Sequence, residues 1–198
     1  MPREALSPPS ALPLTLGAAR AKIVSSDLPA AAAIFIVWRT IMEMPKPQDE
    51  HRKLKTLTGS WVGEETIYPS PWDPQGGPAK SKFQARADMD GFFVLADYVE
   101  ERGGQVAYRG HGVYGYDPQT KAYTMHWFDS MGSGSPAPAR GRWEGDRLSF
   151  EATSPMGQSR YSYRFESDDR YTFTIESSQD GGKTWNKMMD GRFTRKPA

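Results

Sequence analysis

The chain has 198 residues, 37% of them hydrophobic and 12% aromatic, and its 25 basic and 24 acidic side chains leave a net charge of +1. This length fits one domain with a tail, and the near-neutral balance argues against a nucleic-acid partner, which usually requires clustered Lys and Arg. The absence of cysteine excludes disulfides, thiolate metal sites and a cysteine nucleophile, and it fits a cytoplasmic location.

Residues 1–43 are rich in Pro, Ala and Ser and contain one apolar run, Leu28 to Trp38. The run is shorter than the roughly 20 apolar residues of a membrane-spanning helix. Its length would suit the core of a signal peptide, but the small-x-small cleavage site of a signal peptide does not follow it. We therefore expect no membrane partner. We expect residues 1–43 to be a disordered extension, or to lie upstream of the native start, and residues 44–198 to form the domain.

After the prolines at 45 and 47, Gln48 to Leu57 predicts a short amphipathic helix, because Leu54 and Leu57 are spaced i, i+3 and charged residues fill the rest. Gly59 ends the helix, and beyond it apolar and polar residues alternate, which predicts strands. Turn signals such as Asp90-Gly91 separate them. The predicted strands cover residues 61–68, 82–89, 92–98, 106–116, 123–128, 140–144, 147–152, 161–166, 171–176 and 185–194.

About ten strands joined by short turns, with no long helix between them, predict an all-β fold. We expect an antiparallel up-and-down barrel of the calycin kind with a short N-terminal helix, because closure removes exposed strand edges. A β-sandwich is the alternative, but nothing in the sequence indicates long Greek-key crossovers.

Gly59-Ser60-Trp61 begins the first strand, and Arg192 and Arg195 lie in the last one. This arrangement resembles the lipocalin and fatty-acid-binding superfamily, in which an arginine of the final strand covers the indole of a Gly-x-Trp triplet. The resemblance implies that Trp61 closes the barrel floor and that a guanidinium stacks over it.

A wider pattern is more specific. It consists of Pro45-Lys46-Pro47, Glu50 to Leu54, Leu57 to Trp61, Gly115-Tyr116-Asp117 and Trp127 to Met131. Over residues 45–196 the chain resembles the bacterial family known as domain of unknown function 1579. The resemblance implies a calycin barrel and so supports the fold. It transfers no reaction, cofactor or catalytic residue.

Nitrobindin-type barrels are more distantly similar and bind haem through a histidine near the last strand. The predicted last strand, Trp185 to Thr194, has no histidine, so we expect no haem or other cofactor. His51, His111 and His126 are the three histidines, and none has a metal-ligand spacing, so no metal site is predicted.

Two further motifs receive structural interpretations. Ser178 to Trp185 matches the Asp-box pattern, Ser-x-Asp-x-Gly-x-x-Trp, and a single copy predicts a hairpin turn rather than a propeller blade. Glu64-Glu65 and Glu100-Glu101 are neighbours within strands, so the members of each pair point to opposite faces and cannot share a site. No catalytic residue is identified.

Large apolar side chains on the inward parity of their strands favour a ligand-binding interior. They are Phe83, Met89, Trp127, Tyr163 and Phe173. Such residues nearly fill an eight-stranded barrel, whereas about ten strands leave space for a small ligand. A fully packed interior is the alternative.

Three polar residues, Arg109, His126 and Asp129, are candidates for the same interior. Strand ends are also common places for Asp, which leaves a purely structural role for Asp129 open. We therefore expect a binding protein for a small, largely apolar ligand, as a monomer or homodimer. The alternatives are an enzyme that uses polar groups of the lumen, and a packed structural barrel without a ligand.

Overall fold

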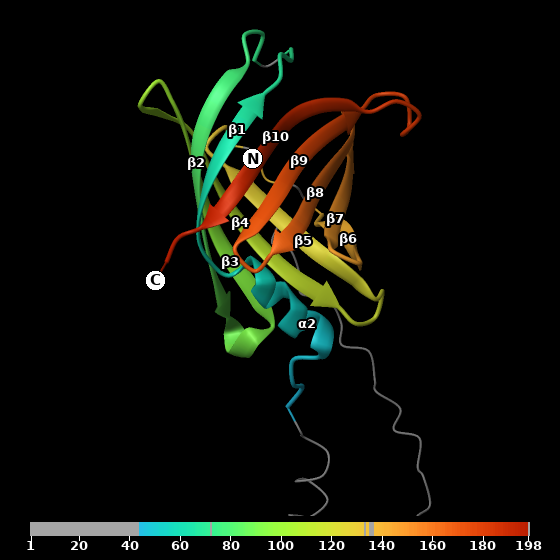
Figure 1. Ribbon diagram of the computed structural model, residues 1–198. Helices are drawn as coiled ribbons and strands as arrows, with labels where there is room; N and C mark the ends of the chain where they lie inside the picture. Colours follow the sequence, from blue (N-terminus) through green and yellow to red (C-terminus); the bar gives the residue numbers. More distant parts are fainter. Residues whose placement is uncertain (1–43, 72, 133, 135–136, 198) are drawn as a thin grey trace, which may run out of the picture. The chain divides into compact units, whose positions relative to one another are not determined.

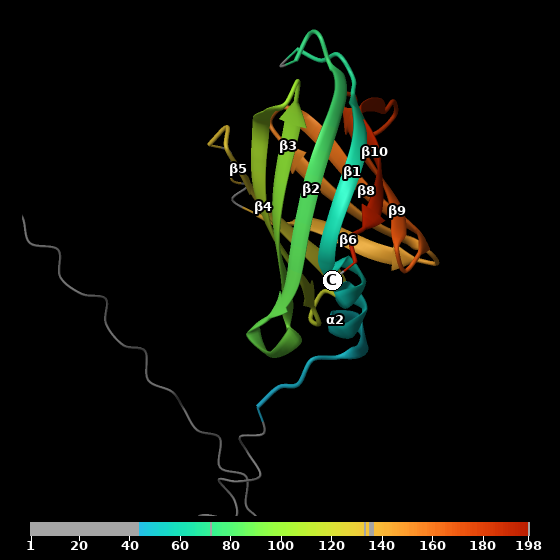
Figure 2. The ribbon, with the colours of Figure 1, turned by 60° about the vertical axis from the view of Figure 1, so that its left-hand side comes forward.

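The structure, a computed structural model, describes residues 44–197 except 72, 133, 135 and 136. The extension expected for residues 1–43 lies outside this part of the chain. A short helix, α2 (Asp49–Lys53), continues as a 3-10 turn, η1 (Leu54–Leu57), and lies at one end of a barrel of strands (Figures 1 and 2). The strands are β1 (Gly59–Ile67), β2 (Gly77–Asp88), β3 (Phe93–Arg102), β4 (Gln105–Asp117), β5 (Ala122–Asp129), β6 (Ala139–Glu144), β7 (Arg147–Ser154), β8 (Gly157–Ser167), β9 (Arg170–Ser178) and β10 (Asn186–Arg195).

Each of the ten strands pairs antiparallel with its neighbours in the chain, and β1 also pairs with β10, so the sheet closes into a barrel. The predicted up-and-down barrel with a short N-terminal helix is therefore confirmed, and the sandwich alternative is wrong. Alternate residues of each strand point inward, as burial along β1 shows: Trp61, Gly63 and Glu65 are buried, and Glu64 is exposed.

The end of β2 differs from its prediction. Strand alternation predicts that Met89 points inward, but it lies in a 3-10 turn, η2 (Met89–Gly91), with 64% of its surface exposed. The Asp88 carboxylate accepts a hydrogen bond from the Met89 N–H at 2.7 Å, and both Met89 and Asp90 have positive φ. Strand alternation stops at Asp88, so the prediction for Met89 is corrected.

Trp61 lies at the floor of the barrel and is 1% exposed. Its indole N–H donates to the carbonyl of Leu57 at 3.0 Å, which fixes η1 beneath the ring. The guanidinium of Arg195 lies 4.0 Å from the ring centroid and donates to the carbonyls of Thr56 and Thr58. A charged group over an aromatic face and several satisfied carbonyls together hold the floor closed.

Gly59 permits this arrangement, because it has a φ of +117° and a Cβ at its position would overlap the Arg195 guanidinium. Arg192 does not take part. It is exposed on the outer face opposite Glu64, three residues before Arg195 and therefore on the other parity. Of the two candidate arginines, the structure places Arg195 at the plug, and the role expected for Arg192 is corrected.

The Asp-box residues form the turn between β9 and β10, as predicted. The Asp180 carboxylate accepts hydrogen bonds from the backbone N–H groups of Lys183 and Thr184 and from the Thr184 hydroxyl. These bonds, led by that of the hydroxyl, lower the pKa of Asp180 to about 2. The Trp185 indole donates to the carbonyl of Gly182, and Arg160 lies 4.2 Å over its ring.

We expect Trp61→Ala to lower the free energy of unfolding by about 3–5 kcal/mol, the range for removing a large buried aromatic side chain. Urea denaturation of both proteins measures the change. A loss below about 1 kcal/mol would show that the indole is not a plug.

Arg195→Ala should lower the free energy of unfolding by about 1–3 kcal/mol, because it removes the cation over Trp61 and leaves backbone carbonyls unpaired. Arg192→Ala is the matched control on the same strand and should change it by no more than about 0.5 kcal/mol. Equal effects of the two substitutions in denaturant titrations would contradict the assignment of Arg195 to the floor.

Candidate ligand-binding cavity

A cavity of about 530 Å³ lies inside the barrel, beyond the floor residues and toward the end where β1 finishes. Small-molecule sites usually have volumes of about 300–1,000 Å³. Aromatic and aliphatic side chains from most strands make up the larger part of its wall. They include Ile67, Phe83, Met125, Trp127, Tyr161, Tyr163, Tyr171, Phe173, Ile175, Met189 and Phe193.

Five of the eight residues predicted for the lumen line this cavity: Phe83, Trp127, Asp129, Tyr163 and Phe173. Their role in binding a ligand stays a prediction. Their positions follow from strand alternation, because each has the parity of buried neighbours such as Met125 on β5.

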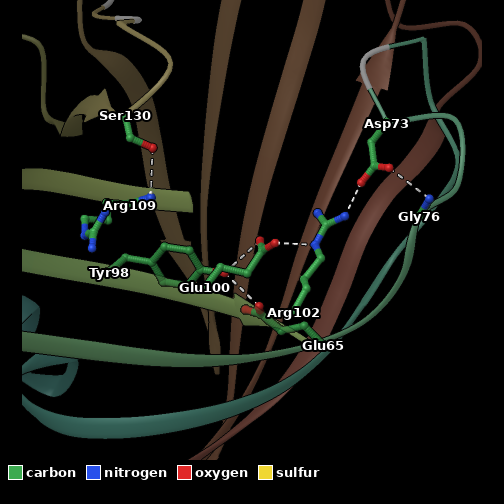
Figure 3. A network of polar contacts seen from close by, with 8 residues as sticks. All are labelled: Glu65, Asp73, Gly76, Tyr98, Glu100, Arg102, Arg109 and Ser130. Carbon is green, nitrogen blue, oxygen red and sulfur yellow. Dashed lines mark hydrogen bonds and ion pairs between the residues drawn. The ribbon is translucent and has the colours of Figure 1, made fainter. Parts of the chain in front are cut away.

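The other three lie outside the cavity. Met89 is exposed in η2 at the end of β2, as described above. Arg109 is exposed because Tyr108 and Gly110 take the inward positions of β4, and its backbone N–H bonds the Ser130 hydroxyl, apart from the cavity network (Figure 3). His126 lies between Met125 and Trp127, which both face inward, so it faces outward. The lumen positions expected for these three residues are corrected.

A polar patch interrupts the apolar wall at Tyr98 and Glu100, and a second buried carboxylate, that of Glu65, bonds the Tyr98 hydroxyl (Figure 3). Glu65 is 4% exposed and Tyr98 is 6% exposed, and the Tyr98 hydroxyl donates to Glu65 Oε2 at 2.7 Å. Tyr98 and Glu100 both line the cavity from β3, two residues apart and thus on one face.

Arg102 connects this patch to the loop between β1 and β2. Its Nε donates to Glu100 Oε1 at 2.6 Å, and its Nη1 pairs with the carboxylate of Asp73. Asp73 also accepts the backbone N–H of Gly76 at 3.0 Å. The hydrogen bond from Arg102 lowers the pKa of Asp73, so this carboxylate stays ionised at neutral pH.

Burial raises the pKa of Glu65 to about 7, although the hydrogen bond from Tyr98 favours the ionised form. The Ser81 hydroxyl lies near enough to favour ionisation too, but neither Ser81 Oγ nor Glu65 Oε1 completes a hydrogen bond of normal geometry. Gly191 faces Glu65 across the β1–β10 pair, and a Cβ there would contact the Glu65 side chain. A glycine at this position therefore gives the carboxyl group its space.

A second polar chain lies on the β4–β5 side of the cavity. The Trp127 indole donates to the Tyr108 hydroxyl at 2.8 Å, and that hydroxyl donates to Asp129 Oδ2 at 3.2 Å. Asp129 Oδ1 accepts the backbone N–H of Met131 at 2.9 Å. Asp129 thus lines the cavity and also holds the start of the loop after β5.

Alternation within a strand correctly predicts that Glu64 and Glu65 point to opposite faces, and likewise Glu100 and Glu101. It does not predict that Glu65 and Glu100, which come from different strands, lie close together. These two residues come from β1 and β3 and meet across β2, where Ser81 pairs with Glu100. The signal that could have found Glu65 is its spacing from Trp61, because residues four apart in a strand share a face.

Among the described residues, no group of three or more His, Cys, Asp or Glu side chains is arranged to hold a metal ion. His51 is buried against Phe92 and Tyr116, where its Nδ1 accepts the backbone N–H of Gln48. Within the same part of the chain, no helix has the length and apolar character needed to span a bilayer.

Because the pKa of Glu65 rises from 4.5 to about 7, the folded state holds more protons than the unfolded state between these values. Stability therefore falls as the pH rises through this window, by as much as about 3 kcal/mol. We expect Glu65→Gln to match the wild type at a pH of about 4 and to be more stable than it above a pH of about 8. Urea titrations at the two pH values measure this difference.

Glu64→Gln is the control, because Glu64 is the exposed neighbour of Glu65 on the same strand. It should leave the pH dependence of stability unchanged. If Glu65→Gln and Glu64→Gln show the same pH profile as the wild type, the carboxyl of Glu65 does not titrate as described.

Several solved structures resemble this fold, among them the following two. Rv2717c from M. tuberculosis matches with a TM-score of 0.56 and 13% sequence identity, over 74% of this chain and 96% of that chain. An S-type phycobiliprotein lyase, CPES from Guillardia theta, matches with a TM-score of 0.54 and 12% identity, over 78% of this chain and 99% of that chain. No curated protein matches the sequence.

At these identities the two similarities describe the fold alone. The family relationship rests on the sequence, where a single family model matches residues 46–195 and so covers the helix and all ten strands. The chain therefore belongs to the family described as "Protein of unknown function (DUF1579)".

Proposed function

We propose that the barrel binds a small, largely apolar molecule in the cavity opposite the Trp61 floor. The observation that carries the proposal is the cavity itself, with a volume of about 530 Å³ and a wall of mainly aromatic and aliphatic side chains. A site of this size, with a few polar groups among apolar ones, is typical of small-molecule binding.

The arrangement of the aromatic rings favours binding over a packed interior. Toward the floor the rings pack closely: Trp61 lies edge-on to Tyr171, and Tyr171 stacks on Phe193 at 4.7 Å. Tyr171 and Phe193 also line the cavity. Farther along, rings such as Tyr163 and Phe173, 4.4 Å apart, pack against each other along the wall and leave the centre open. Protein interiors are normally close-packed, so an open volume of this size calls for a ligand.

Among similar barrels, the one from Guillardia theta is named as a phycobiliprotein lyase. The ligand of the present chain has to be inferred from its own cavity.

Binding can be tested with N-phenyl-1-naphthylamine, a neutral apolar dye whose fluorescence rises in apolar surroundings. We expect saturable binding at one site per chain. Ile175→Trp should weaken it at least about tenfold, because the larger ring occupies the cavity that Ile175 lines.

Thr174→Trp is the matched control, since the neighbouring residue on β9 has the outward parity and adds the same ring outside the barrel. It should leave the dye affinity unchanged. The proposal fails if the wild type shows no saturable binding, or if the two tryptophan substitutions weaken binding equally.

A further inference from the structure

The charged groups that line the cavity are mainly acidic. Among the described residues of the lining, Asp73, Glu100 and Asp129 are acidic and Arg102 is the one basic residue. Asp73 and Glu100 already share Arg102, through its Nη1 and Nε respectively. An anionic ligand would therefore meet a guanidinium that is already paired and a surplus of carboxylates, and burying it there would be unfavourable.

We propose that this cavity selects an organic cation, an apolar body that carries a protonated amine, and that Glu100 and Tyr98 receive the ammonium group. The inference rests on the proposed function, because it names the chemical class of the ligand for the same cavity.

The hydrogen-bond directions in the wall support this choice. The Tyr98 hydroxyl directs its proton to Glu65 Oε2 at 2.7 Å, so its oxygen presents lone pairs to other partners. The Trp127 indole N–H is used by Tyr108, whose own proton goes to Asp129. The protons of Tyr98, Trp127 and Tyr108 are thus engaged with other side chains. In this part of the wall the hydroxyl and carboxylate oxygens are left as acceptors, which an ammonium group with three donors can use.

Glu100 offers such an acceptor. Its Oε1 accepts from Arg102, while its Oε2 accepts only a long hydrogen bond of 3.5 Å from the Tyr98 hydroxyl, which bonds Glu65 at the shorter distance of 2.7 Å (Figure 3). The side chain of Glu100 is about nine-tenths buried, so a charge-assisted hydrogen bond to Oε2 would form away from water, where such bonds are strongest.

The buried carboxyl group of Glu65 is a second, independent observation that favours a cation at Tyr98 and Glu100. It is 96% buried, its inward side chain meets the hydroxyl of Tyr98, and its Oε1 has no hydrogen-bond partner. A buried carboxylate with an unsatisfied oxygen is costly, and a cation bound at Tyr98 and Glu100 would stabilise its ionised form. The Tyr98 and Trp127 rings lie 6.1 Å apart beside this position and offer π-faces that also favour a cation.

Three matched probes distinguish the ligand classes: 2-(2-naphthyl)ethylamine, 2-(2-naphthyl)ethanol and 2-naphthylacetate. Their apolar bodies are the same, and at a pH of about 8 the first is a cation and the last an anion. Isothermal titration calorimetry with the full chain should show the amine binding at least about tenfold tighter than the alcohol, and the carboxylate binding weakest of the three.

Two variants assign the preference to the proposed groups. Glu100→Gln and Glu65→Gln should each lower the ratio of amine affinity to alcohol affinity several-fold, and saturable binding of the alcohol to each variant reports an intact cavity. Glu101→Gln is the control, because Glu101 is the next residue of β3, faces outward and pairs with Lys82 on the surface.

The outcomes separate the two proposals. If the alcohol binds but the amine has no advantage, or if the advantage persists in both the Glu100 and Glu65 variants, the cation assignment is wrong and the binding function stands. A carboxylate that binds as tightly as the amine also overturns the assignment. If none of the three probes binds, the binding function fails, and the assignment fails with it.

Discussion

The stacking of Arg195 on Trp61 is the interaction on which the rest of the barrel depends. It joins the first residues of β1 to the last residues of β10, and Arg195 also bonds the carbonyl of Thr56 in η1 and that of Thr58 just after it. Because Trp61 is paired with Arg195 in the register of these two strands, the contact fixes which residues of β1 face inward. The buried position of Glu65, four residues along, follows from the anchoring of Trp61.

The two ends of the barrel differ in how closely they are packed. Floor residues such as Leu54, Leu57 and Tyr171 are almost fully buried and supply the packing on which stability rests. The cavity end leaves its centre open and buries carboxylates, which are both unfavourable to the free protein. Stability that is given up at functional sites is commonly offset by packing elsewhere, and the separation of the two regions along β1 permits that here.

Local pattern predicted most of the fold, because strand alternation and turn residues are properties of adjacent positions. It also placed Phe83, Trp127 and Tyr163 in the wall, but it failed where alternation stops, as at Met89 beyond Asp88. The patch of Glu65, Tyr98 and Glu100 could not be predicted in the same way. It depends on the register of three strands, and register is set by pairing over the whole barrel rather than by neighbouring residues.

The closure of β1 on β10 has a consequence for biosynthesis. The edge of β1 is completed by residues that lie more than a hundred positions later in the chain, so it stays open while the ribosome makes the intervening strands. Nascent and truncated chains that lack β10 therefore carry two unpaired strand edges, which are templates for association between chains. Pairing of β10 with β1 removes both edges at once, because it closes the barrel.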